Sequence, residues 1–308
     1  MKTRILVVGT LLCCANANAK HDIEFVAEHL PEVAMDNRYA TLPVWTASTS
    51  QPDDGWTLAA QGSFTRASAD ALEVGGPMLS FAASRALSSR WTVTVLGFAD
   101  ELSLSGGDER DLQTLFAPLT PIARPVAARF DGLDGSVNHY GAGFAFSTAS
   151  DRGWLGAHRW VGGVLFEDVD LRDYSWNFLI LAGPDAGTRG RIDFDNSYRH
   201  ATPFAGLQIV RESGDWIFSP HALLALPLPR RGWVGHIATD QFDIRGDTAD
   251  VGNGKHFGDP SVTVGFDITY RPAHLTVDVG TALSQALLEP FVHKGIDQNW
   301  VLSVRWQH

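Results

Sequence analysis

The C-terminal part of the chain alternates between apolar and polar residues in three consecutive runs. The apolar faces of these runs hold Val262, Val264, Phe266, Ile268 and Tyr270, then Leu275, Val277, Val279, Thr281 and Leu283, then Trp300, Leu302, Val304 and Trp306. Successive side chains of a β-strand point to opposite faces, so each run predicts a strand with one apolar and one mostly polar face. A soluble sheet can show the same alternation. The rest of the sequence must therefore decide where the apolar faces point.

Ten segments predict strands, and short and long connections alternate between them. The strands are expected at 56–66, 78–88, 90–101, 139–149, 154–168, 201–212, 215–228, 257–271, 274–286 and 298–306, and the longer connections at 67–77, 102–138, 169–200, 229–256 and 287–297. Bacterial outer-membrane barrels have short periplasmic turns, longer outer loops and an even number of strands. We therefore expect an all-β fold, a transmembrane antiparallel up-and-down β-barrel of about 10 strands (8–12), with both termini in the periplasm.

Two features leave the strand count open. Segments 171–182 and 190–199 are able to pair as a further hairpin, which would give twelve strands. Pro220 and Pro227 lie inside the expected strand 215–228, where a proline removes a hydrogen bond of the ladder. That strand is expected to be bulged or shorter than the alternation indicates.

The N-terminal residues 1–19 have the composition of a secretory signal peptide. Lys2 and Arg4 precede a short apolar stretch, and Ala17-Asn18-Ala19 offers a cleavage site between small residues. Both cysteines, Cys13 and Cys14, would leave with the signal. We divide the remainder into residues 20–55, an N-terminal periplasmic lead or inner segment, and residues 56–308, the barrel.

The charge excludes one class of partner. The chain carries 24 Lys/Arg and 35 Asp/Glu, and removal of residues 1–19 takes away two Lys/Arg and no Asp/Glu, so the net charge falls from −11 to 22 − 35 = −13. Nucleic-acid binding is not expected at this balance. An acidic surface is compatible with loops that meet the divalent cations bridging lipopolysaccharide. After residue 19 no apolar stretch reaches the ~20 residues of a transmembrane helix.

Tryptophan residues occur near the ends of the expected strands. The residues expected at the membrane interfaces are Trp91, Trp154, Trp216, Trp300 and Trp306. Aromatic residues gather at both interfaces of transmembrane barrels, where an apolar ring with a polar group suits the headgroup region.

The C-terminus resembles the recognition signal of bacterial outer-membrane β-barrel proteins. Such proteins usually end in an aromatic residue preceded by apolar residues at alternating positions. Trp306 matches that aromatic, with Val304, Leu302 and Trp300 before it, although Gln307 and His308 follow it. The resemblance implies export through the general secretory route to a Gram-negative outer membrane, where outer-membrane lipid and the barrel-assembly machinery are the expected partners.

Charged residues on the polar faces of the last strands are candidates for the lining of a pore. They are Asp267, Arg271, Asp278 and Arg305. Acidic and basic groups in one lumen create a transverse field that selects small polar solutes. Small barrels also fill their interior with side chains, so such charges can simply pair with each other. Loop 102–138 is unusually apolar and is expected either to narrow the mouth or to pack over the rim. The function predicted first is a small pore or solute-uptake channel, for a solute that the sequence does not identify.

Two alternatives remain. The first is a structural or surface-interaction barrel without transport, in which loop 229–256, with Arg245-Gly246-Asp247, would contact a partner. The second is a barrel-embedded hydrolase, because Ser219 and His221 share one strand face and a serine needs a neighbouring base. His139 or His158 would have to complete that set. The histidines show no metal-ligand spacing, so neither a metal nor a cofactor is expected.

Overall fold

A computed structural model describes residues 33–45, 55–69, 72–111, 127–151, 156–181, 186–228, 234–239, 243–246, 260–283 and 296–308. The strands are β1 (Trp56–Ala69), β2 (Leu72–Ala86), β3 (Trp91–Asp111), β4 (Ala127–Ser150), β5 (His158–Ile180), β6 (Arg189–Ile209), β7 (Arg211–Ser213), β8 (Trp216–Ala225), β9 (Val234–Thr239), β10 (Asp243–Gly246), β11 (Ser261–Tyr270), β12 (Leu275–Ala282) and β13 (Ile296–Gln307). A short 3-10 turn, η2 (Arg271–Ala273), joins β11 to β12.

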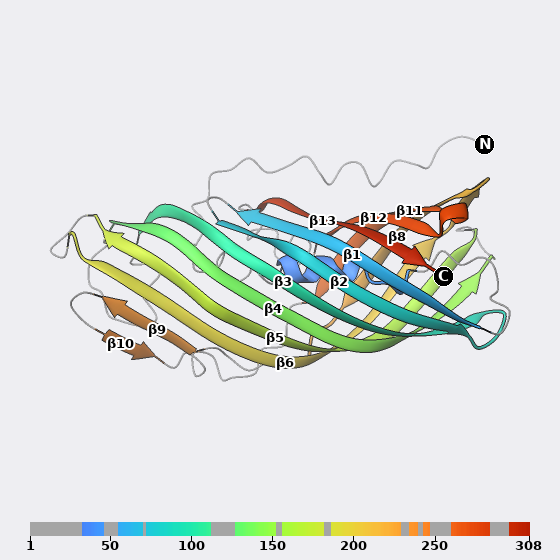
Figure 1. Cartoon of the computed structure of the whole chain (residues 1–308), viewed down its shortest axis with the longest axis horizontal. Coiled ribbons are helices and arrows are strands. Elements are labelled where there is room, and N and C mark those ends of the chain that lie inside the picture. The colour runs from blue at the N-terminus through green and yellow to red at the C-terminus, as the bar shows by residue number, and fades with distance from the viewer. Residues whose placement is uncertain are drawn as a thin grey trace.

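The sheet closes into a barrel of ten antiparallel strands. Each strand pairs with its neighbour around the ring β1-β2-β3-β4-β5-β6-β8-β11-β12-β13, and β13 pairs back onto β1 from Ala59↔Gln307 to Ala69↔Ile296. The β6–β8 pairing completes the wall from Phe204↔Ala225 to Gln208↔His221. Figure 1 shows the resulting tilted strands of the wall. The expected all-β, ten-strand antiparallel barrel is therefore confirmed.

The two ends of the barrel differ. One end, here called the turn end, holds the short connections after β2, β4, β6 and β11, together with the first residue of β1 and the last of β13. At the other end, the loop end, β9 pairs with β6 from Gly190↔Thr239 to Asp195↔Val234 and β10 pairs with β9. These two short strands lengthen one side of the wall beyond the ring (Figure 1).

Several strands are longer than the alternation predicts. Most of the expected loops 67–77 and 102–138 belongs to the strands β1 to β4, and only residues 70–71 and 112–126 lie outside the described part. The β4 strand has 24 residues, whereas about 9–11 residues suffice to cross a bilayer. The extra length therefore projects past the membrane, where nothing forces the outer face to be apolar, and the alternation fades there.

For the same reason, the alternative of twelve strands, with a further hairpin, does not hold. Segments 171–182 and 190–199 do face each other, but as continuations of β5 and β6 beyond a register shift between Leu171 and Tyr174. The expected irregularity at Pro220 is present: β8 pairs with β6 up to His221 and with the separate strand β7 from Phe218. Proline has no amide hydrogen to donate, so the ladder breaks at this position.

The barrel is apolar outside and polar inside. Outward positions in the ring carry exposed large residues, for example Phe81, Phe166 and Val279, each about half exposed. The inward positions are buried and mix apolar with polar side chains, and the polar ones include Gln61, Thr65, Asp100, His139, Glu167, Gln208, His221, Asp267, Asp278 and Arg305. A soluble protein buries its apolar face, so this reversed pattern is that of a barrel whose outer surface faces lipid.

Exposed aromatic residues form a ring around the turn end. Trp91 starts β3, Trp216 starts β8 and Trp306 lies one residue before the end of β13, and all three are close to half exposed. Trp216 packs against Tyr270 of the next strand, with ring centroids 4.7 Å apart. Trp300 is partly buried nearer the loop end and lies beside Phe64. Trp154 lies outside the described residues.

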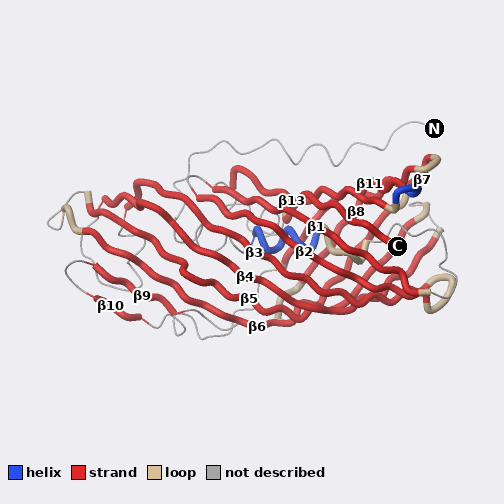
Figure 2. The backbone as a smooth tube through the Cα atoms, viewed as in Figure 1, coloured by secondary structure: helices blue, strands red, loops and turns tan. Residues whose placement is uncertain are grey.

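An α-helix accompanies the strands in the described part of the chain. Residues 33–40 form two turns of α-helix, and residues 41–45 continue from it as turns. In the tube view of Figure 2 this helix, the inner helix, is enclosed by the strands. No helix among the described residues is long and apolar enough to cross a membrane.

Candidate functional site

Residues 33–45, here called the inner segment, occupy the barrel lumen. Every residue of this segment is buried except Asp36, which is partly exposed. Its side chains and carbonyl groups meet inward residues from strands on all sides of the ring. The wall residues are Thr65, Asp100, Glu167, Gly206, His221, Gly280 and Asn299. The inner segment therefore spans the lumen from wall to wall at this level.

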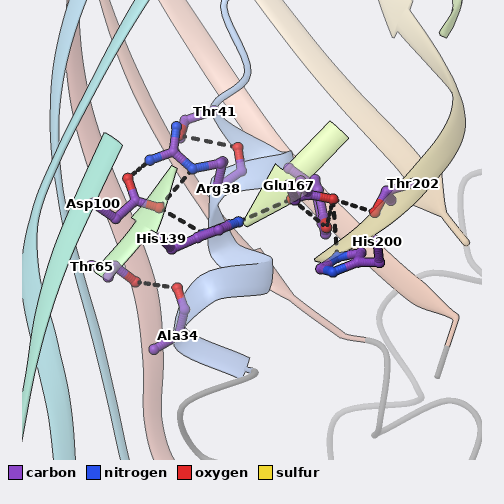
Figure 3. Close-up of polar contacts among 10 residues, drawn as sticks. Ala34, Arg38, Thr41, Thr65, Asp100, His139, Glu167, His200 and Thr202 are labelled. Atoms are coloured by element: carbon purple, nitrogen blue, oxygen red, sulfur yellow. Dashed lines mark hydrogen bonds and ion pairs between the residues drawn. The ribbon is translucent and has the colours of Figure 1, made fainter. Parts of the chain in front are cut away.

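A chain of charged and polar groups fastens the inner helix to one side of the wall. Arg38 forms an ion pair with Asp100 and donates from Nε to Asp100 Oδ2 at 2.8 Å. His139 lies between two carboxylates, with Nδ1 3.0 Å from Asp100 and Nε2 3.1 Å from Glu167. Figure 3 shows this chain of contacts running from the helix along β3, β4 and β5. The charges are buried, and each has a partner of opposite or compatible charge, as buried charges require.

Glu167 is the centre of the second half of the network. Its carboxylate also accepts a hydrogen bond from Thr202, and His200 Nε2 lies 3.2 Å away (Figure 3). The phenol of Tyr39 donates to the same carboxylate at 3.1 Å. Burial, and then the nearby Glu167 charge, raise the pKa of Tyr39 well above its ordinary value. The phenol therefore keeps its proton and remains a donor to the carboxylate.

The other side of the inner helix is held by neutral hydrogen bonds. Asn37 donates to Thr65 at 2.8 Å and to Asn299 at 2.6 Å, and its side-chain oxygen accepts from the backbone of Ala282 at 2.8 Å. At the C-terminal end of the helix, His221 Nε2 lies 2.6 Å from the Ala40 carbonyl oxygen. The last carbonyl groups of a helix have no partner inside it, and here a wall side chain satisfies one of them.

Between the inner helix and the turn end, the contact between the inner segment and the wall is apolar. Leu42, Val44 and Trp45 are fully or almost fully buried in a cluster with wall residues that include Leu96, Phe98, Leu165 and Phe204. Wall glycines make room for this segment. A Cβ atom at Gly206 would lie 2.6 Å from the Trp45 ring, and one at Gly280 would lie 2.5 Å from Ala40 Cβ.

Three of the four charged residues expected to line the lumen lie together on the inner wall. Asp267, Asp278 and Arg305 are fully buried on β11, β12 and β13, and Arg305 Nη2 lies 3.5 Å from Asp267 Oδ2. Arg271 does not join them. It begins the turn η2, where its guanidinium forms an ion pair with Glu212 at the surface. The strand ends one residue earlier than expected, and this displaces Arg271 from the lumen.

The residues of the hydrolase alternative do not meet. Ser219 and His221 are both buried on the inner face of β8, but His221 Nδ1 lies 3.3 Å from the Ser219 backbone oxygen, and Ser219 Oγ has no hydrogen-bond partner among the described residues. His139 belongs to the Asp100–Glu167 network, and His158 bonds to the Gly156 carbonyl at the turn end. These distances leave Ser219 without the base that a nucleophile requires.

The two loops singled out by the sequence are only partly described. Of loop 229–256, residues 234–239 and 243–246 form β9 and β10, so Arg245 and Gly246 lie in a strand whereas Asp247 is outside the described residues. The apolar part of loop 102–138, from Leu112 to Val126, also lies outside them.

The role of the inner segment is not predicted by any local pattern in the chain. Two helical turns are too short for the 3.6-residue period to be recognised, and Pro31 and Pro43 frame them. One signal for a group inside the lumen was available. Asp100, His139 and Glu167 occupy inward positions of three consecutive strands, and two buried carboxylates beside one histidine require a cationic partner.

Comparison with solved structures finds other outer-membrane barrels at low sequence identity. The translocator domain of autotransporter NalP from Neisseria meningitidis aligns with a TM-score of 0.43 and 12% identity, covering 92% of this chain and 97% of that one. The CymD monoaromatic hydrocarbon channel aligns with a TM-score of 0.42 and 11% identity over 92% and 96%. OprG from Pseudomonas aeruginosa aligns with a TM-score of 0.30 and 9% identity, covering 84% of this chain and 98% of that one. No family model and no curated protein matches the chain.

Proposed function

We propose that the protein is a small-solute pore of the Gram-negative outer membrane, gated by its own residues 33–45. The observation that carries this proposal is the polar, charged contact between the inner segment and the wall. The Arg38–Asp100 pair and the Tyr39–Glu167 bond are buried inside the barrel. A filling that only stabilised the barrel would be expected to be apolar, because burying a salt bridge costs desolvation that apolar packing avoids.

The same polar lining allows a second, water-filled state. If the inner segment left, Asp100, His139 and Glu167 would be hydrated, whereas the apolar outer surface would still face lipid. Ten strands enclose a narrow lumen, so the solute would be small. Arg159 and Arg305 face the lumen as well as Asp267 and Asp278, and opposite charges on a pore wall favour small polar solutes.

The cellular setting forms part of this proposal. The lipid-facing barrel and its aromatic ring suit the outer membrane, to which the signal-like residues 1–19 would direct the chain. In this setting the last strand, β13, would be recognised by the barrel-assembly machinery, and the acidic surface would meet lipopolysaccharide through bridging cations.

The alternative is a structural or surface-interaction barrel without transport. One observation favours it: Leu42, Val44 and Trp45 pack into an apolar cluster with residues of the surrounding wall. Such packing would hold the segment permanently and leave no path.

A reversible cross-link between the inner helix and the wall separates the two functions. The Asn37 side chain lies against Thr65 at 2.8 Å, and the chain has no cysteine beyond Cys13 and Cys14. We expect the double variant Asn37→Cys/Thr65→Cys to lose conductance in planar bilayers when oxidised and to regain it after reduction. The single variant Asn37→Cys is the control for the loss of the hydrogen bond. Equal conductance in the oxidised and reduced double variant would rule out gating by this segment, and absence of conductance in every form would favour the structural alternative.

A further inference from the structure

We propose that His221, Asp267 and Asp278 bind one divalent transition-metal ion of the Zn²⁺ class inside the barrel. The three residues come from consecutive strands of the ring, β8, β11 and β12, and all three are buried. One ligand atom from each lies within 4.8 Å of the others. Because 45 residues separate His221 from Asp267 in sequence, no local spacing reveals the group.

The described residues place one arginine within ion-pair distance of these two carboxylates and give the carboxylates few hydrogen bonds. Asp267 and Asp278 stand directly opposite each other in the β11–β12 ladder, an arrangement that destabilises a sheet when both are charged. Arg305 lies 3.5 Å from Asp267 and offers a single positive charge. Both oxygens of Asp278, and Oδ1 of Asp267, have no hydrogen-bond partner among the described residues. Buried charged oxygens without partners call for a cation or a proton.

The histidine is oriented in the manner of a metal ligand. Its Nε2 lies 2.6 Å from the Ala40 carbonyl oxygen, which only accepts, so Nε2 carries the hydrogen. Metal-binding histidines commonly donate their other ring N–H to a backbone carbonyl in this way. Nδ1 then faces Asp267 Oδ2 at 3.9 Å, whereas Asp278 Oδ1 lies 4.0 Å from Nε2, so the Asp278 carboxylate would have to turn toward Nδ1 to share an ion with it. The ring is also fixed by stacking on Trp45, with centroids 4.6 Å apart.

A second contact defines the metal-free alternative. His221 Nδ1 also lies 3.3 Å from the Ser219 carbonyl oxygen, a longer approach than the 2.6 Å at Nε2. If both nitrogens carried hydrogens, a His221 imidazolium would balance one carboxylate, and the two aspartates would share a proton. The test must separate this arrangement from metal binding.

The donor set selects the kind of metal. One imidazole nitrogen and two carboxylates suit Zn²⁺ and related ions, whereas Mg²⁺ and Ca²⁺ prefer oxygen alone. Zn²⁺ ligands lie about 2.0–2.2 Å from the ion, so the side chains would have to close inward by roughly 1 Å. Gln208 Nε2 donates to Asp267 Oδ2 at 3.1 Å and so orients that carboxylate.

Metal binding here would also strengthen the docking of the inner segment. His221 joins the site to the last carbonyl groups of the inner helix through Ala40. A bound ion would hold the imidazole with Nε2–H toward that helix. This consequence concerns stability alone and does not depend on whether the barrel conducts.

The test is Zn²⁺ titration of the untagged full chain, freed of metal by a chelator, in detergent micelles by calorimetry. We expect one ion per chain in the wild type. We expect at least a tenfold loss of affinity in Asp278→Asn and in His221→Gln, and a loss of about 10–100-fold in Gln208→Ala, which removes only an orienting contact. Asp168→Asn is the matched control, because Asp168 is a strand carboxylate paired with Arg199 away from the lumen cluster. Zn²⁺ should also raise the temperature at which the wild-type barrel unfolds, and should not do so in Asp278→Asn.

Gel mobility before and after boiling shows whether each variant is folded. No Zn²⁺ binding to a folded wild type would overturn the proposal, and so would equal binding by wild type and both ligand variants. Absence of binding together with a higher unfolding temperature in Asp278→Asn would establish the shared proton instead. Ca²⁺ binding at least as tight as that of Zn²⁺ would also contradict the proposed donor set.

Discussion

At the scale of the residue, small inward positions decide whether the lumen can hold a helix. Gly280 lies under Ala40, and Gly206 lies under the Trp45 ring. A methyl group at either position would meet the inner segment, and also a backbone oxygen of the neighbouring strand, closer than atoms normally approach. The outward glycine Gly62, in contrast, has room for a side chain, because a Cβ atom added there would lie 4.0 Å from its nearest neighbour, Cδ2 of Leu79. The fit between wall and inner segment therefore depends on which face a glycine occupies.

Replacing Gly280 by valine should displace the inner segment. Overpacking of this kind costs about 1–3 kcal/mol, and we expect the temperature of unfolding in detergent to fall and the conductance in bilayers to rise. Gly62→Val, which adds the same atoms on the lipid face, should change stability by no more than about 0.5 kcal/mol. Equal effects of the two substitutions would show that the backbone, and not the fit of the inner segment, is being disturbed.

At the scale of the element, the outward residues of each ring strand lie at different depths in the membrane. On β13, Trp306 belongs to the belt of exposed aromatic residues around the turn end. Leu302, which is close to half exposed, lies on the same outward face four residues nearer the loop end. Along a tilted strand this distance leads from the interface toward the middle of the apolar band. The two residues share a strand and a face and differ in depth.

An arginine should therefore be tolerated at one of these positions and not at the other. We expect Leu302→Arg to lower the free energy of unfolding by about 2–4 kcal/mol and Trp306→Arg by about 0–1 kcal/mol beyond the loss of the indole ring. Urea titration of protein folded into lipid vesicles measures both values. A Leu302→Arg cost no larger than that of Trp306→Arg would mean that the apolar band lies elsewhere on the barrel.

Elements within the membrane were predictable, and elements outside it were not. The run from Val262 to Tyr270 alternates because lipid demands apolar residues on its outer face, and β11, at Ser261–Tyr270, lies within the expected strand 257–271. The parts of β3 and β4 nearer the loop end were expected to be loop. On β3, for example, Leu102 and Leu104 point inward and serines face outward, so this part lacks the apolar outer face that marks a membrane strand. Among the site residues, Asp267, Asp278 and Arg305 followed from alternation, whereas Arg38 and Asp100 meet only in three dimensions.

At the scale of the whole molecule, the continuous hydrogen-bonded ring should resist detergent. The ring is sealed where β13 meets β1, and Leu58 and His308 exchange two backbone hydrogen bonds there, at 2.7 and 2.8 Å. Within the closed ring there is no free strand edge from which unfolding can begin.

Electrophoresis of an outer-membrane fraction tests this closure directly. We expect the unheated protein to migrate at a position different from that of the boiled protein, because the barrel stays compact in SDS until heated. Identical mobility, with the protein found in the soluble periplasmic fraction, would contradict both the closed barrel and its location.

The position of the inner segment also determines the order in which the molecule can assemble. Asn37 precedes all ten ring strands in the chain, yet it bonds to Thr65, 28 residues away, and to Asn299, 262 residues away. A helix of two turns is not stable alone in water, so it cannot form stably before its partners in the last strands have been synthesised. Contacts of such long sequence separation slow folding. The segment made first would become ordered last, and the barrel must close around it or admit it afterwards.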